Sequence, residues 1–233
     1  MAIVGADKLS PIRGKSTSSL LFADGACAVI LGRFENNYNT GILASHTGGN
    51  PVLNEALKMR DRCTKIDFKN EDYRIKRDMH MDGYVVYDQA RFIIPDTFFK
   101  LLKIANLDAN QVKYLFKHQA SEKILSKSSY EALRRIGYEE SDIRKFIEQF
   151  RKEKVPKSIH YLGNSSVATT GTLLDIILKK KVENPKLEEL LKELENYKIN
   201  EDDIIALLSV GAGLGWAGQL IKMCPIYWDY LKN

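Results

Sequence analysis

The chain contains little cysteine, and the cysteines it has are poorly placed for cross-links. Cys27, Cys63 and Cys224 are the only three, and they lie far apart without a CxxC pair. An odd number of separated cysteines argues against a disulfide framework and against a structural zinc site. This pattern is typical of a reducing compartment, so we expect a cytoplasmic protein whose cysteines are structural.

Long hydrophobic runs are also missing. No apolar stretch approaches the roughly 18 residues that cross a bilayer, and residues 1–7 lack the basic and apolar segments of a secretory signal. We therefore expect neither a membrane span nor export. Glycine and proline are sparse, at 15 and 6 of 233 residues, and 44% of the chain is apolar. This composition excludes collagen-like and wholly disordered proteins and predicts one large or two small globular domains.

The motifs of several large functional classes are absent. The four histidines show neither i,i+4 pairing nor an HExxH motif, so we expect no metal site. The G-x-S-x-G elbow of serine hydrolases does not occur. The net charge of +5 favours acidic partners. Lys-rich runs at 151–157 and 179–181 are more typical of solvated surfaces, and no finger, RRM or P-loop pattern accompanies them, so we expect no nucleic acid.

Apolar runs and turn residues predict alternating strands and helices. We expect strands at 20–22, 28–31, 84–87, 112–116, 159–162 and 204–210, and helices at 95–107, 121–136, within 138–157, 167–180 and 185–197. Residues 35–76 have a loose polar pattern with one helical stretch near 54–60, which predicts an irregular or inserted region. The alternation from Gly83 onward predicts an α/β fold with buried strands.

A literal G-x-G-x-x-G runs from Gly213 to Gly218, directly after an apolar strand. A dinucleotide site needs a helix, a second strand and an acidic residue about 20 positions further on. Only 233 − 218 = 15 residues follow. Glycines that permit a tight turn or close backbone approach are the better interpretation. We expect no dinucleotide and no other cofactor.

Two polar residues stand out by their context. His118 follows the apolar run 114–116 and precedes a helix, and strand ends are where α/β folds display functional groups. A lone histidine is more often structural. Asn164 likewise lies between a short predicted strand and a helix, where a loop or helix N-cap role is the ordinary interpretation. On local pattern alone, both roles stay open for both residues.

Three segments in this order resemble the C-terminal part of β-ketoacyl-acyl-carrier-protein synthase III, a thiolase-fold condensing enzyme. They are His118-Gln-Ala-Ser-Glu-Lys-Ile124, Gly163-Asn-Ser-Ser166 with its helix, and Val210-Gly-Ala-Gly-Leu-Gly-Trp-Ala-Gly218. The resemblance continues in Leu21-Phe-Ala-Asp-Gly-Ala-Cys-Ala-Val-Ile-Leu-Gly32, Val4-Gly-Ala-Asp-Lys-Leu9 and Met81-Asp-Gly83. It covers most of the chain outside residues 35–80 and 138–158.

The resemblance implies a set of roles. His118 and Asn164 match the pair that assists decarboxylation of a malonyl thioester and stabilises the thioester oxyanion. Gly83, Ser121, Gly211 and Gly213 match substrate-binding positions, and Lys123 falls where a basic residue meets the acidic acyl carrier protein. The implied partners are acyl carrier protein, acyl-coenzyme A or malonyl thioesters, and a second copy or a Cys-bearing half.

The resemblance also implies a division of the chain. Residues 1–34 would be the end of the N-terminal thiolase-like half, 35–80 an irregular connecting region, and 81–233 the C-terminal half with a charged insertion near 138–158. Ser121 stands where the family commonly has Asn, and Ala212 replaces a Gly.

The family's nucleophilic cysteine lies upstream of the strand at Val4-Gly5, and none of the three cysteines matches it. We therefore expect the chain to be a truncated product of a synthase gene, a half-enzyme completed by another polypeptide, or a non-catalytic partner subunit. Because His118 and Asn164 are both present, the first two are favoured over the third. Alone, such a chain should be inactive and should expose a large apolar face.

Overall fold

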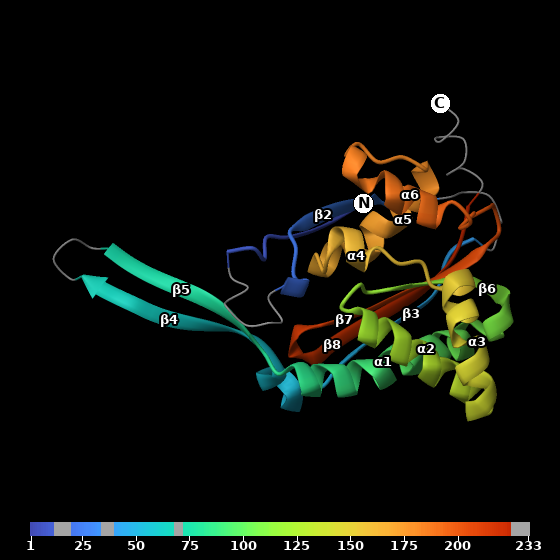
Figure 1. Ribbon diagram of the computed structural model, residues 1–233, viewed down its shortest axis with the longest axis horizontal. Coiled ribbons are helices and arrows are strands. Elements are labelled where there is room, and N and C mark those ends of the chain that lie inside the picture. The colour runs from blue at the N-terminus through green and yellow to red at the C-terminus, as the bar shows by residue number, and fades with distance from the viewer. Residues whose placement is uncertain (12–19, 34–39, 68–71, 225–233) are drawn as a thin grey trace.

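The computed structural model describes residues 1–11, 20–33, 40–67 and 72–224, and it leaves out the side chains of residues 59–78 (Figure 1). Strands β3 (Gly41–Gly49), β6 (Val112–Lys117), β7 (Ile204–Gly211) and β8 (Gly215–Lys222) form one sheet in the order β3-β8-β7-β6. β6 and β7 are parallel, and the other neighbours are antiparallel. The predicted α/β class is confirmed.

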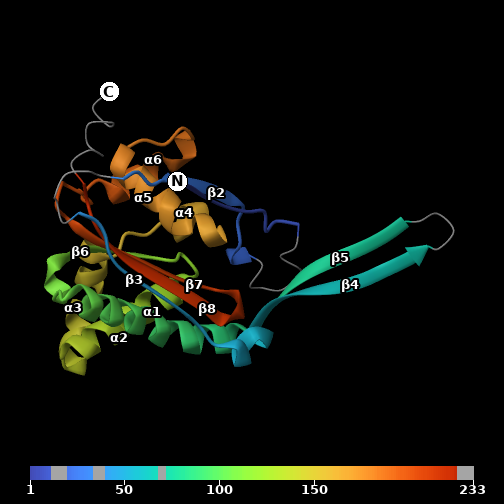
Figure 2. The same cartoon turned by 180° about the vertical axis from the view of Figure 1, so that it is seen from behind.

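Helices cover both faces of this sheet (Figures 1 and 2). Helices α1 (Gly83–Ala105) and α2 (Glu122–Ile136) lie on one face, where Phe98 and Leu101 pack with Leu208. Helices α5 (Thr169–Lys179) and α6 (Glu188–Leu194) lie on the other, where Leu173 and Leu190 share a core with Ile205. Burial of these apolar side chains is the main term that holds the three layers together.

The two-residue period of β6 decides which side chains face which layer. Leu115 belongs to the α1 side of the core, whereas Tyr114 and Phe116 belong to the α5 side. Successive side chains in a strand point to opposite faces. Continuing the alternation, Lys117 bonds to side chains of α2 and His118 to a side chain of α5. The end of β6 therefore delivers its last two polar side chains to different layers.

Helix α1 corrects two of the sequence predictions. Residues 84–87 were expected to form a strand, and Pro95 was expected to open the helix, but α1 begins at Gly83 and contains Pro95 in its interior. The Asp82 side chain caps this helix by accepting from the N–H groups of Tyr84 and Val85, both at 3.1 Å. A side-chain cap of this kind satisfies the first amides of a helix, and it outweighs the β-propensity of the Val and Tyr residues.

The next helices follow the predicted order. Ser121 caps α2, and Gly137 ends it in the left-handed conformation with φ 102°. The charged insertion forms helix α3 (Glu140–Lys154). Residues 159–162, predicted as a strand, form the one-turn helix α4 (Ile159–Leu162), whose Leu162 N–H donates to Ser158 O. Short 3₁₀ turns occur at Ala109–Gln111, Ser166–Ala168, Pro185–Leu187 and Ala212–Leu214.

The two strands nearest the N-terminus form a separate two-stranded sheet. Strand β1 (Ala2–Asp7) pairs antiparallel with β2 (Gly25–Ile30), so the predicted strand at 28–31 is found, three residues longer at its start. The predicted strand at 20–22 reduces to one bridge between Phe22 and Asn164. This small sheet exposes Val4 and Ile30 on one face and, less fully, Ile3 and Val29 on the other.

Residues 35–80 are more regular than the sequence predicts. β3 is an edge strand of the main sheet, a 3₁₀ turn follows at Pro51–Ala56, and β4 (Leu57–Asp67) pairs with β5 (Asp72–Met81) in a hairpin. This hairpin projects from the body of the molecule in both views (Figures 1 and 2). The expectation of an irregular region was wrong for these strands, whereas the division of the chain into thiolase-like halves stays a prediction. Within the described ranges, no helix has the length and apolarity needed to cross a membrane.

Candidate active site around His118 and Asn164

His118 lies at the carboxyl end of β6, on the face that packs against α5. Its backbone N–H donates to Leu208 O at 2.7 Å, which extends the pairing with β7 by one residue. The residue is 8% exposed. Burial disfavours the charged imidazole and lowers the pKa of His118 to about 4. The side chain is therefore neutral at pH 7.

Asn164 lies in the turn between α4 and α5 and is also buried. Its backbone N–H donates to Leu21 O at 2.7 Å, and its carbonyl accepts from Ala23 N–H at 2.9 Å. Gly163 makes this approach possible, since its φ is 64° and a Cβ there would lie 3.0 Å from Ala23 Cβ. The side-chain Oδ1 accepts from Ser166 N–H at 2.9 Å. This bond fixes which end of the amide faces away from the turn.

Thr169, the first residue of α5, connects the two candidates. Its Oγ1 lies 2.7 Å from His118 Nδ1 and 3.0 Å from Ser166 O, its backbone N–H donates to Ser166 O, and Ser166 N–H donates to Asn164 Oδ1. His118, Thr169, Ser166 and Asn164 thus form one hydrogen-bonded chain, which we call the His–Asn chain. His118 and Asn164, which are 164 − 118 = 46 positions apart, are thereby linked through the Thr169 side chain and the Ser166 backbone.

The His–Asn chain leaves one nitrogen of each candidate free. In the described part of the chain, no group bonds to His118 Nε2 or to Asn164 Nδ2, and neither atom is an enclosed polar atom without a partner. Both nitrogens can therefore reach a ligand. Two N–H donors held in place beside a mostly buried surface are what stabilises negative charge that develops on a carbonyl oxygen.

The small β1–β2 sheet packs against the turn that carries Asn164. A Cβ on Gly5 would meet Val167 Cγ2 at 2.7 Å, and one on Gly25 would meet Ser165 Cβ at 2.6 Å. Val167 N–H points to Asp7 Oδ2 at 3.4 Å. Two of the motifs that carry the family resemblance, at Val4-Gly5 and Asp24-Gly25, are thus explained by close packing against the turn that positions Asn164.

The glycine loop lies between β7 and β8, at the same end of the sheet as His118. The loop joins two antiparallel strands as a hairpin. A dinucleotide site would instead need a strand, the glycine loop and then a helix. Gly213 has φ 120°, a conformation that L side chains rarely adopt, whereas a Cβ on Gly211 would meet nothing within 4 Å. Gly83 lies at the start of α1, and Leu214 of the loop packs with Val86 from the first turn of that helix.

The remaining predicted site residues lie on the first turn of α2. Ser121 Oγ accepts from Ile124 N–H at 3.3 Å as the N-cap, which gives it a structural task besides the predicted substrate contact. Lys123 is exposed. The structure therefore places Ser121 and Lys123 just beyond His118 along the chain, on the α2 side of the sheet.

Gln119 is a residue that the sequence analysis did not single out. It is fully buried, and its side chain makes three bonds: its Nε2 donates to Lys117 O at 2.8 Å and to Pro156 O at 3.5 Å, and its Oε1 accepts from Ser158 N–H at 3.0 Å. These bonds hold the end of β6 to the segment that leads into α4 and Asn164. The only sequence signal was its place in the His-Gln-Ala motif. Thr169 had no signal beyond a polar residue at the start of a predicted helix.

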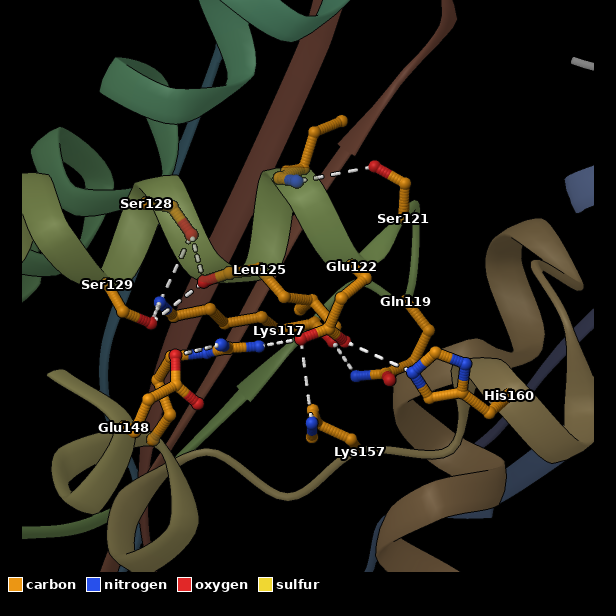
Figure 3. Close-up of polar contacts among 12 residues, drawn as sticks. Lys117, Gln119, Ser121, Glu122, Leu125, Ser128, Ser129, Glu148, Lys157 and His160 are labelled. Carbon is orange, nitrogen blue, oxygen red and sulfur yellow. Dashed lines mark hydrogen bonds and ion pairs between the residues drawn. The ribbon is translucent and has the colours of Figure 1, made fainter.

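A second polar cluster surrounds the start of α2 (Figure 3). The Glu122 carboxylate bonds to Arg151 Nη2 and lies 3.5 Å from Lys157 Nζ and from His160 Nε2. Partial burial raises the pKa of Glu122, but the Arg151 hydrogen bond and the charges of Arg151 and Lys157 hold the pKa below its usual value. The insertion helix α3, through Arg151, thereby anchors the helix that follows His118.

The cysteines are placed as follows. Cys27 lies in β2, where its Sγ would be 2.7 Å from a Cβ on Gly171 of α5, so it fills a gap left by that glycine. Cys224 is partly buried at the end of the described chain. Cys63 lies in β4, and its side chain is outside the described residues. Among the residues whose positions are described, no group of three or more His, Cys, Asp or Glu could hold a metal ion.

The layered sheet with helices on both faces has the thiolase-like fold. Solved 3-oxoacyl-acyl-carrier-protein synthase III structures from Pseudomonas aeruginosa PAO1 and Aquifex aeolicus VF5 match it with TM-scores of 0.66, at 20% and 22% identity. They cover 96% and 95% of this chain, which spans 57% of each of theirs. The priming β-ketosynthase of the R1128 polyketide pathway matches with a TM-score of 0.63 at 20% identity, over 96% of this chain and 57% of that one. These likenesses establish the fold.

Sequence comparison points to the same enzymes. The chain is 28% identical over 222 residues to β-ketoacyl-acyl-carrier-protein synthase III of Staphylococcus aureus strains Newman and USA300, a match that covers 94% of this chain. The chain spans 56% of the length of those relatives. No protein-family profile matches it. The resemblance that the sequence motifs predict is thus confirmed.

Proposed function

We propose that this chain is the His- and Asn-bearing part of a β-ketoacyl synthase III-like condensing enzyme. The observation that supports this most directly is the His–Asn chain, which bonds His118 Nδ1 and Asn164 Oδ1 and leaves His118 Nε2 and Asn164 Nδ2 free for a ligand among the described residues. A scaffold has no need of two such nitrogens on a mostly buried surface.

In the proposed reaction an acyl group is carried as a thioester on a cysteine. A malonyl thioester loses CO₂, and the electron pair of the broken C–C bond becomes an enolate whose oxygen carries the negative charge. Its α-carbon attacks the acyl thioester, a new C–C bond forms, and the cysteine thiolate leaves. His118 and Asn164 would donate to the thioester oxygen as the enolate develops, which lowers the barrier because the donors are already oriented.

The substrates in this proposal are acyl-coenzyme A or acyl-carrier-protein primers and a malonyl thioester. Exposed Lys123 on the first turn of α2 is the proposed contact for the acidic carrier protein, a role that the net charge of +5 suits. Gly83, Ser121, Gly211 and Gly213 remain the proposed substrate-binding positions. No cofactor takes part in this chemistry.

The nucleophilic cysteine is proposed to come from a segment outside the positions of Cys27, Cys63 and Cys224. That segment would be either the upstream part of the same polypeptide or a separate subunit. The exposed apolar residues of the β1–β2 sheet, among them Val4 and Ile30, support a cover of this kind, with a second copy of the chain as the further partner. A cytoplasmic location fits cysteines without a pair.

In the first experiment, the coding sequence upstream of Met1 is determined and the longest open reading frame is expressed. Intact-mass measurement after incubation with an acyl thioester then asks whether a cysteine becomes acylated. Acylation of an upstream cysteine is the expected result. If no such cysteine exists, the same measurement is made on this chain mixed with a candidate Cys-bearing subunit.

The role of the two side chains is tested in the acylated enzyme. His118→Ala and Asn164→Ala are each expected to lower decarboxylation and condensation by about 10²–10³-fold, which is typical for removal of one such donor. His160→Ala is the matched control, because His160 is largely exposed and, among the described residues, its side chain has one polar partner, Glu122. Unchanged turnover in the His118 variant would contradict the catalytic proposal and would favour a non-catalytic partner of a condensing enzyme.

A further inference from the structure

His118 is a neutral imidazole, and a neutral imidazole can carry its one proton on either ring nitrogen. The two forms present opposite chemistry at Nε2: one offers an N–H donor and the other a lone pair. Burial keeps the ring uncharged, since the pKa of His118 is lowered to about 4. Whatever decides the tautomer therefore decides what His118 can do to a ligand.

Thr169 Oγ1 is the only described group that bonds to the ring, and its hydroxyl has one proton for two acceptors. Oγ1 lies 2.7 Å from His118 Nδ1 and 3.0 Å from Ser166 O. Hydrogen bonds donated by hydroxyls have typical lengths of about 2.7–2.8 Å, whereas those donated by N–H groups are typically about 2.9–3.0 Å. The shorter contact therefore has the length of a bond donated by the hydroxyl to Nδ1.

The partners of Thr169 support the same direction. Ser166 O already accepts the backbone N–H of Thr169, so it does not depend on the hydroxyl proton. Gln119 N–H approaches Oγ1 at 3.4 Å and uses an oxygen lone pair. A hydroxyl that accepts from one side and donates to the other satisfies all its neighbours, and Nδ1 is left as the acceptor.

We propose that Thr169 is a positioning residue that holds His118 as the neutral tautomer with its proton on Nε2. The ring then presents an N–H donor, beside the amide of Asn164, to the oxygen of a bound thioester. The catalytic value of this tautomer rests on the proposed function. The tautomer itself can be measured without any activity.

Two variants separate the hydroxyl from the shape of the side chain. Thr169→Val keeps the branched shape and removes the hydroxyl, whereas Thr169→Ser keeps the hydroxyl and removes a methyl group. Long-range ¹H–¹⁵N spectra of histidine-labelled protein at pH 7 report which ring nitrogen carries the proton. The chain has only four histidines, and the signals of His118 are those that disappear in His118→Gln.

The wild type and Thr169→Ser are expected to show a protonated Nε2 and a bare Nδ1. In Thr169→Val the preference should be lost and the two forms should mix. A wild type with its proton on Nδ1 overturns the inference, as does a Val variant with an unchanged spectrum. Because the wild-type spectrum alone can overturn it, the inference stays falsifiable even if Thr169→Val does not fold.

Activity of the acylated enzyme gives a second readout. Thr169→Val is expected to lower kcat for condensation roughly tenfold, the equivalent of one ordinary hydrogen bond, with KM for the primer unchanged. Thr169→Ser should recover most of the loss. A changed tautomer with unchanged kcat would overturn the positioning role. Failure of His118→Ala to reduce turnover would instead overturn the proposed function, and the tautomer would stand.

Discussion

Replacing Lys117 with methionine is expected to stabilise the protein at neutral pH. The Lys117 side chain is 1% exposed, and among the described residues its Nζ donates to Ser129 Oγ at 2.8 Å and Ser128 Oγ at 3.1 Å, as Figure 3 shows. Both hydroxyls donate onward to Leu125 O. Burial, with a smaller contribution from the charge of Arg151, lowers the pKa of Lys117 from 10.5 to about 7.

The size of the effect follows from the pKa difference between the folded and unfolded chain. At pH 7 a lysine with a pKa of about 7 when folded and 10.5 when unfolded costs about 4 kcal/mol of stability. Methionine avoids that cost but loses two hydrogen bonds worth about 1 kcal/mol each. The free energy of unfolding of Lys117→Met should therefore exceed that of the wild type by about 2 kcal/mol at pH 7.

The difference in the free energy of unfolding between Lys117→Met and the wild type changes sign with pH. Between pH 7 and 10.5 the unfolded chain binds more protons at Lys117 than the folded one, so the wild type gains stability relative to the variant as pH rises. With the same numbers, the two stability curves cross near about pH 9. Below pH 7 both states hold the proton, and this group adds no further pH dependence.

The assay is urea unfolding from pH 6 to 10, followed by tryptophan fluorescence. Lys113→Met is the matched control, because Lys113 lies on the same strand but is partly exposed and paired with Asp203 at 2.6 Å. This control should lose about 1 kcal/mol or less, without a crossing. A Lys117→Met variant that is no more stable than wild type at pH 7, or a difference that does not change with pH, would refute the reasoning.

Two further predictions concern the site. Gly213→Ala should lower the free energy of unfolding by about 1–3 kcal/mol in the same urea assay, because the φ of Gly213 is 120°. Gly211 has a φ of −150° and open space around it, so Gly211→Ala should change the free energy of unfolding by less than about 0.5 kcal/mol. Equal losses in the two variants would contradict the assignment of strain to Gly213. The condensation rate should show no His118 titration between pH 6 and 8, since the pKa of His118 is lowered to about 4. The same pKa shift should make the free energy of unfolding fall as pH drops from about 6.5 to 4, because the unfolded chain takes up the proton first. A rate profile with a midpoint near pH 6.5 that His118→Gln removes would show that the imidazole is not buried as described.

Local sequence signals identified the elements that carry their own start and stop residues. Ser121 and Gly137 bound α2 as expected, because an N-cap side chain and a left-handed glycine act within a few residues. The strand predicted at residues 84–87 was wrong because β-propensity is a weak preference. The cap at Asp82 and the apolar face of a long helix outweighed it. Strand β3 was missed because its partner, β8, lies near the other end of the chain, whereas β4 and β5 pair locally but were missed because most of their residues are polar.

The same distinction applies to the site. His118 and Asn164 could be named from the motifs around them, and the family resemblance supplied their joint role. Thr169 and Gln119 could not, because their importance comes from bonds to residues 51 and 39 positions away. A hydroxyl at the start of a helix looks the same in sequence whether it faces water or an imidazole.

The support of the Asn164 turn by β1 and β2 has a consequence for how the protein folds. The contacts that fix this turn join residues 160 positions apart, between Asp7 and Val167, and others join Leu21 and Ala23 to Asn164. Closing loops of this length costs chain entropy before any contact repays it, which slows folding. The hairpins and the α1–α2 layer can form earlier from local contacts, so a chain can regain most of its secondary structure while Asn164 is still unplaced. The site is thus among the last parts of the molecule to be assembled.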